Sequence, residues 1–226
     1  MKKESIVYGI IGLIVGSIIG FMFANSVNKN GPQVVSANTT MGQPAPANVD
    51  PAEAHQANMP EVQAALEKAK SEPNNFDAQV NAASFYMQIQ RFDQAIELLQ
   101  RANKIQPENY DVIVGLGNAY FDTNKFQDAE KWYQVALEKK QDDVNVRTDY
   151  GLTFLLREKP DYDRSIAEFN KSLEIDPQHK QTLQNLTVAY TRKGDSANAT
   201  ETYRKLEALD AQNPMLAQLK SEIDKL

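Results

Sequence analysis

Similar residues recur 34 positions apart along the middle of this 226-residue chain. Ala83, Gly117 and Gly151 stand at that spacing, and an aromatic residue follows each of them three positions later. Residues three or four apart lie on one face of a helix, so each copy predicts the same helical face. A fixed period of this length is typical of chains in which each unit buries its apolar side only by stacking on the next one.

A second helix is predicted in each copy. Its entry carries an aromatic residue in the first three copies, at Phe92, Phe126 and Tyr162, and a small residue three positions later. The aromatic side chain fills the gap between the two helices, and the small residue allows their backbones to approach closely. Pro107 and Pro177 stand in turns to the next copy, where a proline can end one helix without breaking another.

These residues resemble the tetratricopeptide repeat (TPR), a helix–turn–helix unit with small residues at the helix crossings and a closing proline. The resemblance covers four repeats, at 76–109, 110–143, 144–179 and 180–213. It implies an all-α fold, a right-handed TPR α-solenoid of four helical hairpins with capping helices. The sequence departs from the pattern in two repeats. The third has two extra residues around Pro160, and the fourth has Thr187 for the small crossing residue and Ser196 for the aromatic one.

Two further helices are predicted at the ends of the stack. Residues 61–71 resemble the second half of a repeat and would complete a TPR domain over 61–213. Three apolar residues of the segment 214–226 share one helical face: Leu216, Leu219 and Ile223. Terminal repeats expose an apolar side, so we expect this C-terminal helix to cover it.

The N-terminal segment is unlike the rest of the chain. Residues 6–24 run for 19 positions without a charge, enough for a helix to cross the hydrocarbon core of a bilayer. We interpret them as an uncleaved single-pass transmembrane anchor, because bulky Met22 stands where a signal-peptide cleavage site has a small residue. Residues 1–5, with Lys2 and Lys3, would be a short cytoplasmic flank. The repeats would then lie on the periplasmic or extracytoplasmic side of the inner (plasma) membrane.

Two features indicate how the repeats would be presented. Residues 25–60 are rich in Asn, Ala and Pro and are predicted to be a disordered linker. Gly12, Gly16 and Gly20 recur every four residues on one helix face, which favours close approach of a second helix and hence a homodimer. The alternative is that these glycines reflect only how common glycine is in membrane helices.

The composition argues against several classes of chemistry. The chain has no cysteine and only two histidines, His55 and His179, which leaves no thiolate and no histidine metal site. It contains no phosphate loop, dinucleotide fingerprint or nucleophile motif. The net charge of −6 disfavours nucleic acid as a partner. We therefore expect no enzyme activity, no cofactor and no metal, and a protein or peptide as the partner.

In TPR proteins the first helices of successive repeats line a concave groove, and the resemblance assigns twelve residues of this chain to it. They are Val80, Ser84, Met87, Val114, Asn118, Phe121, Thr148, Leu152, Leu155, Gln184, Val188 and Thr191. The set is semi-apolar with amide groups, which suits an extended or helical segment with apolar side chains. Some TPR domains bind a C-terminal carboxylate through Lys and Arg, but Val80, Thr148 and Asp149 stand at those positions here. The alternative for each residue is that it only packs between repeats.

Together these features indicate a membrane-anchored adaptor that assists the assembly or maturation of a cell-envelope complex. The alternative is a self-oligomerising membrane scaffold that associates through Gly12, Gly16 and Gly20.

Overall fold

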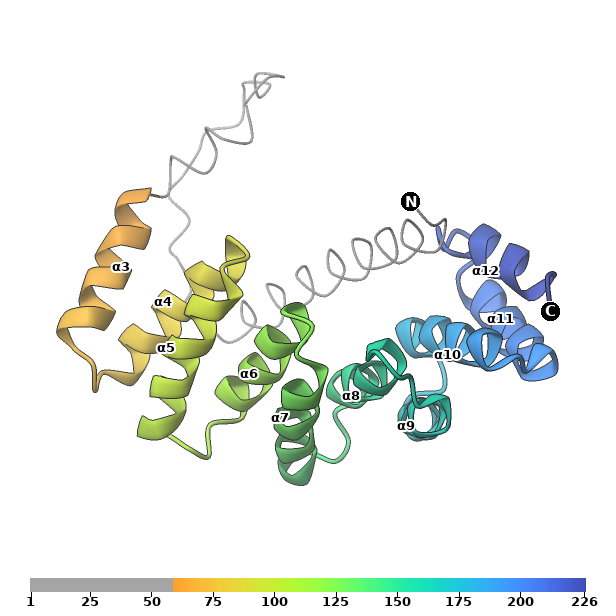
Figure 1. Ribbon diagram of the computed structural model, residues 1–226, viewed down its shortest axis with the longest axis horizontal. Coiled ribbons are helices and arrows are strands. Elements are labelled where there is room, and N and C mark those ends of the chain that lie inside the picture. The colour runs from red at the N-terminus through yellow and green to blue at the C-terminus, as the bar shows by residue number, and fades with distance from the viewer. Residues whose placement is uncertain (1–58) are drawn as a thin grey trace, which may run out of the picture. The chain divides into compact units, whose positions relative to one another are not determined.

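The computed structural model describes residues 59–226, and all regular structure in that range is helical (Figure 1). The helices are α3 Met59–Ser71, α4 Phe76–Gln88, α5 Phe92–Ile105, α6 Tyr110–Asp122, α7 Phe126–Lys139, α8 Val144–Leu156, α9 Tyr162–Ile175, α10 Lys180–Lys193, α11 Ser196–Leu209 and α12 Leu216–Ile223. The predictions for the flank, for the anchor with its three glycines and for the linker up to residue 58 lie outside the described residues. Between residues 59 and 226, no helix has the length and apolarity that a membrane span requires.

The helices fall in pairs at the positions of the four predicted repeats. The pairs α4–α5, α6–α7, α8–α9 and α10–α11 correspond to the four repeats, and each pair consists of two helices of 13 or 14 residues. The N-terminal helix α3 begins two residues earlier than predicted, and α12 ends at Ile223 rather than at the C-terminus. The described part of the chain is therefore all-helical and consists of successive helix pairs of the kind expected for TPRs.

Short polar side chains determine where the first helices of the repeats begin. Asn75, Asn109 and Asp143 precede α4, α6 and α8, and each side-chain oxygen accepts a hydrogen bond from a backbone N–H three residues on, at 3.0–3.1 Å. Each bond satisfies a donor that the first turn of a helix leaves unpaired. His179 occupies the same position before α10, but its side chain makes no capping bond.

An equivalent backbone hydrogen bond closes the turn between the two helices of each repeat. The bonds run from Arg91 N–H to Tyr86 O, from Lys125 N–H to Tyr120 O, from Asp161 N–H to Phe154 O and from Asp195 N–H to Tyr190 O, at 2.8–2.9 Å. The bond in the third repeat spans two more residues than the others, around Pro160. The predicted insertion therefore lengthens this turn, and the closing bond is kept.

The chain divides into two compact units between Arg101 and Ala102, within α5, and each unit is considered by itself. In the unit that ends at Arg101, α3 packs against α4. The buried side chain of Gln79 fixes this contact, because its Nε2 donates to the carbonyl oxygen of Ala69 at 2.7 Å.

In the unit from Ala102 onward, each helix from α6 to α12 packs against the next one. Two glycines permit the close crossings inside repeats. A Cβ at Gly117 would lie 2.6 Å from the Tyr133 ring, and one at Gly151 would lie 2.7 Å from the Phe169 ring. Both rings are fully buried. The small crossing residues are therefore required by close packing.

In the fourth repeat a threonine takes the place of the small residue at the helix crossing. Thr187 is fully buried there, and its hydroxyl donates to the carbonyl oxygen of Leu183 at 2.8 Å. The C-terminal helix α12 adds three buried apolar residues to the core of this repeat: Leu216, Leu219 and Ile223. They pack with Leu183 of α10 and Leu206 of α11, so α12 covers an apolar side of the fourth repeat.

Candidate partner-binding face

The structure places the twelve predicted groove residues on the first helices α4, α6, α8 and α10. Five of them are half-buried: Val80, Ser84, Val114, Gln184 and Val188. Four more are buried with a little exposed surface: Met87, Asn118, Phe121 and Thr191. The three from α8 (Thr148, Leu152 and Leu155) are only 0–2% exposed, so they offer almost no surface to a partner.

Contacts with neighbouring residues explain why some predicted groove residues are buried. The ring of Phe121 meets the ring of Phe126 edge-on, with 5.3 Å between centroids. The Thr148 hydroxyl oxygen lies 2.6 Å from that of Thr182 on α10. The Thr191 hydroxyl donates to the carbonyl oxygen of Thr187 at 2.8 Å. These contacts give the three residues a packing role inside the stack.

Asn118 on α6 differs from these three residues, because it contacts a core side chain and also keeps a little exposed surface. The hydroxyl of fully buried Tyr133 donates to Asn118 Oδ1 at 2.8 Å. The bond uses the amide oxygen, and within the described residues the amide nitrogen Nδ2 makes no hydrogen bond. Asn118 can therefore support Tyr133 and still donate to the backbone of a bound segment.

Two half-buried carboxyl groups, Asp122 and Asp149, were not among the predicted site residues. Asp122 ends α6, Asp149 is the sixth residue of α8, and neither has an ion-pair partner among the described residues. Burial raises the pKa of Asp149 to about 8, and the charge of Asp122 adds to this effect. Burial raises the pKa of Asp122 to about 7. Both charges also raise the pKa of Tyr133, after the larger effect of its burial, so the carboxyl groups lie near the Tyr133–Asn118 pair.

A sequence signal for Asp122 does exist. It is the last residue of its helix, where the helix macrodipole disfavours a negative charge. Asp149 stands where some TPR domains have a Lys or Arg that binds a C-terminal carboxylate. In the sequence it therefore only argues against carboxylate binding. The effect of one acidic group on the other cannot be read from the sequence, because it depends on how α6 and α8 are placed in the fold.

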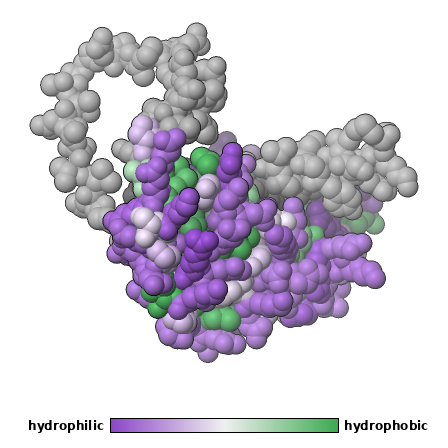
Figure 2. All heavy atoms as spheres, turned by 60° about the vertical axis from the view of Figure 1, so that its left-hand side comes forward, coloured by the Kyte–Doolittle hydropathy of each residue, from purple (hydrophilic) through white to green (hydrophobic). Residues whose placement is uncertain are grey.

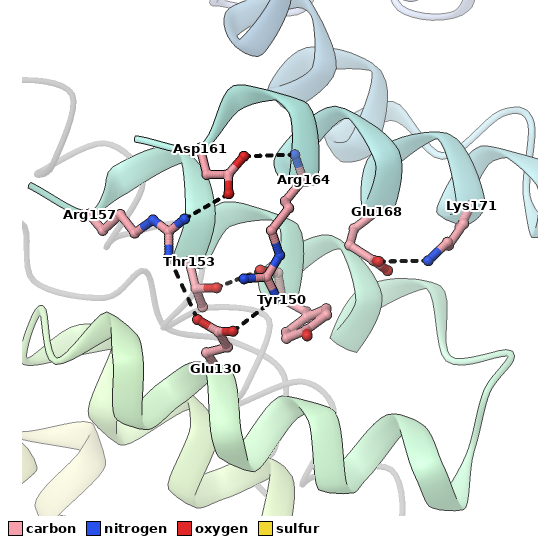
Figure 3. Close-up of polar contacts among 8 residues, drawn as sticks. All are labelled: Glu130, Tyr150, Thr153, Arg157, Asp161, Arg164, Glu168 and Lys171. Carbon is pink, nitrogen blue, oxygen red and sulfur yellow. Dashed lines mark hydrogen bonds and ion pairs between the residues drawn. The ribbon is translucent and has the colours of Figure 1, made fainter. Parts of the chain in front are cut away.

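The charged residues around the third-repeat turn form an ion-pair network (Figure 3). Glu130 of α7 pairs with Arg164 of α9 at 3.0 Å and with Arg157 at 3.9 Å, and Arg157 also pairs with Asp161 at 3.0 Å. The Arg164 guanidinium lies over the Phe154 ring, 4.0 Å from its centroid. The network links α7, the lengthened turn and α9, so we assign it to holding the insertion in place.

A hollow of about 500 Å³ lies on α9, α10 and α11. Its lining is Asn170, Leu173, Glu174, Leu183, Leu186, Tyr190, Asn198, Glu201, Thr202 and Lys205.

The face shown in Figure 2 is mostly hydrophilic, with hydrophobic residues interspersed. The large exposed apolar side chains in the described range are far apart in the sequence: Ile89, Val135, Ile175 and Leu226. Within the same range, no three His, Asp or Glu residues are grouped as metal ligands.

Comparisons with known proteins agree with this geometry. Models described as tetratricopeptide repeat match residues 50–106, 90–148, 155–179 and 182–215. None of the curated proteins compared with the chain is significantly similar to it.

Several solved structures have a similar fold. MamA is 21% identical with a TM-score of 0.63, over 71% of this chain and 86% of that one. YrrB, described as a TPR protein with an unusual peptide-binding site, is 18% identical with a TM-score of 0.64, over 75% and 86% of the two chains. Residues 41 to the end of MamA from Desulfovibrio magneticus RS-1 are 14% identical with a TM-score of 0.64, over 87% and 97%. At these identities the likeness concerns the fold.

Proposed function

Since the chain belongs to the tetratricopeptide repeat family, we propose that it is an adaptor whose first helices bind a segment of another protein. The accessible residues on this face in the unit from Ala102 onward are Val114, Gln184 and Val188, with the amide of Asn118 beside them. Apolar side chains of a bound segment can contact the valines, and the amides can bond its backbone.

The observation that carries the proposal is the pair Asp122 and Asp149. A carboxyl group that is half-buried without a partner destabilises a folded chain, and such groups are concentrated at functional sites. The pair also gives the face a chemical preference. A basic side chain of a bound segment would supply the missing charge, whereas a C-terminal carboxylate would be repelled.

Peptide selection on the full-length chain tests this preference. We expect selected peptides to combine apolar residues with Lys or Arg. Asp149→Asn should weaken their binding about tenfold, equivalent to about 1.4 kcal/mol. Glu138→Gln is the matched control, because Glu138 is an exposed carboxylate on the second helix α7 and its loss should change nothing. Enrichment of acidic peptides, or equal binding by Asp149→Asn, would refute the assignment.

We further propose that residues 6–24 anchor the adaptor in the inner membrane and that the repeats serve a cell-envelope complex outside the cytoplasm. The uncharged 19-residue run and the bases at Lys2 and Lys3 support this topology. Fractionation with reporter fusions at both ends tests it. Full-length protein in the soluble fraction, or an active cytoplasmic reporter at the C-terminus, would contradict it.

The alternative function is a self-assembling scaffold, favoured by the spacing of Gly12, Gly16 and Gly20. Particle size in detergent distinguishes the two functions. The scaffold predicts oligomers that become monomers when residues 1–24 are removed or when Gly16 is changed to Leu. An adaptor that does not self-assemble predicts the same stoichiometry for the unchanged protein, for the truncated protein and for Gly16→Leu.

A further inference from the structure

His179 connects two helices instead of capping one. It is half-buried, and it directly precedes α10. Its Nδ1 lies 2.6 Å from the hydroxyl oxygen of Thr182 on α10, and its Nε2 lies 3.1 Å from Asn145 Oδ1 on α8. Both contacts fall inside the unit from Ala102 onward, at the junction of the third and fourth repeats.

The contact continues into the core through hydroxyl groups. Thr182 Oγ1 lies 2.6 Å from Thr148 Oγ1 on α8, and Thr148 Oγ1 lies 3.4 Å from Ser172 Oγ on α9. All three hydroxyl residues are fully buried. The imidazole ring is therefore the outer end of a polar chain that joins α8, α9 and α10.

The donors and acceptors in this chain depend on the protonation of the ring. Asn145 Oδ1 only accepts, so Nε2 carries the hydrogen, and in the neutral ring Nδ1 accepts from the Thr182 hydroxyl. Uptake of a proton makes Nδ1 a donor and reverses the bond to Thr182. The Thr182 hydroxyl can then donate to Thr148, whose own hydroxyl reaches the carbonyl oxygen of Val144 at 2.7 Å. These hydrogen bonds are therefore all kept after the reversal. The free-energy cost of protonating His179 is then electrostatic.

The charges around the ring largely determine that cost. Burial disfavours the imidazolium and lowers the pKa of His179 from its ordinary value of 6.5, while Asp176 and Asp143 act in the opposite direction. The position at the N-terminus of α10 also disfavours a positive charge, because the macrodipole is positive there. Lys180, the next residue, pairs with Asp210 at 3.4 Å.

We propose that His179 is a pH-sensitive clasp between α8 and α10: both of its hydrogen bonds persist on protonation, but a positive charge on this half-buried ring, at the N-terminus of α10, weakens the junction of the third and fourth repeats. The folded state takes up this proton less readily than the unfolded state does. The clasp therefore contributes fully above the unfolded pKa, near 6.5, and its contribution is lost as the pH falls through the lowered folded pKa. The clasp meets the proposed function at one point: Asp149 of α8 and the accessible residues Gln184 and Val188 of α10 belong to the proposed partner-binding face, so acidification would also weaken the contact between these parts of the face.

NMR of full-length protein labelled with ¹⁵N in histidine tests the clasp directly, because the chain has only two histidines. His55→Gln identifies the His179 signal. We expect the His179 signal of folded protein to show the Nε2–H tautomer and to titrate at lower pH than the same residue in denaturant. A Nδ1–H tautomer, or a folded titration midpoint equal to or above the unfolded one, would overturn the proposal.

Asn145→Asp separates the clasp from a merely structural role. The new carboxylate would face Nε2 and should raise the titration midpoint of His179 by about one unit or more. It should also remove the loss of stability that we expect the unchanged protein to undergo between pH 7 and pH 5. His179→Gln should remove the same pH-dependent loss and lower stability at pH 7. A midpoint unmoved by Asn145→Asp, or an undiminished loss in His179→Gln, would show that His179 does not act as the clasp.

Discussion

The second and fourth repeats build the same helix crossing with different residues. In the second, Gly117 lets the Tyr133 ring approach until it is fully buried. In the fourth, Thr187 occupies the crossing, and the corresponding ring of Tyr203 is 8% exposed, with its hydroxyl bonded to exposed Glu207 at 2.9 Å. The fourth repeat also receives apolar cover from α12. An interior repeat depends on its own crossing, whereas the last repeat relies partly on its cap.

The largest effect should come from truncating the two equivalent rings. Tyr133→Ala removes a fully buried aromatic side chain and should lower the free energy of unfolding by about 3–5 kcal/mol. Tyr203→Ala should lower it by less, because Tyr203 keeps 8% of its surface exposed and its hydroxyl bonds to exposed Glu207, whereas Tyr133 is 0% exposed and bonds to buried Asn118. Chemical denaturation of both variants measures the difference. Equal losses would contradict the proposed distinction between the two crossings.

The cap should account for the next largest effect. Leu219 is 1% exposed in the cluster that covers the fourth repeat. Leu219→Ala should therefore lower the free energy of unfolding by about 2 kcal/mol or more. Leu226→Ala is the control, since Leu226 is 56% exposed and should change stability little. If the two variants melted at the same temperature, α12 would not act as a cap.

A smaller effect is expected from adding one methyl group at a close crossing. Gly151→Ala would place a Cβ 2.7 Å from the Phe169 ring, so ring and helix must shift at a cost of about 1–3 kcal/mol. Thr187→Ala introduces the same residue into the fourth repeat without this clash, and should cost less. Thermal unfolding of the pair compares them. A larger loss in Thr187→Ala would reverse the argument about crossing residues.

The smallest effect is a pH-dependent gain. Asp149 has its pKa raised to about 8 by burial, so the folded state holds its proton more tightly than the unfolded state. Stability from this proton is present at acid pH and is lost as the pH rises toward 8. Asp149→Asn should therefore stabilise the protein at pH 9, on the order of 1 kcal/mol, and much less at pH 5. An equal gain at both pH values would exclude burial of the charge as its cause.

Much of the fold follows from the sequence, because each repeat is determined by local spacing. The 34-residue period, the aromatic residues and the small crossing residues predict all four hairpins, and the apolar face of 216–223 predicts the cap. The insertion around Pro160 also predicts a longer turn. That Thr187 fits the crossing could not be foreseen, because it depends on the hydrogen bond from its hydroxyl to Leu183 and on the cover from α12.

The partner-binding face is harder to predict than the fold. Repeat position alone cannot tell that Thr148 turns toward Thr182, or that Leu152 and Leu155 are almost completely buried. The influence of Asp122 on Asp149 likewise depends on the packing of neighbouring repeats. Val114 and Gln184 keep exposed surface on their helices. They remain predicted contacts for a partner.

The most direct test of the account is a crosslinking comparison between a first and a second helix. A photoreactive amino acid is placed at Val114 on α6 or at Val135 on α7 in the full-length protein, and the cells are irradiated. Val114 is half-buried on the proposed face, and Val135 is 36% exposed on a second helix. The account predicts a partner adduct from position 114 and none from position 135. An adduct from position 135 alone would contradict the claim that the first helices bind the partner.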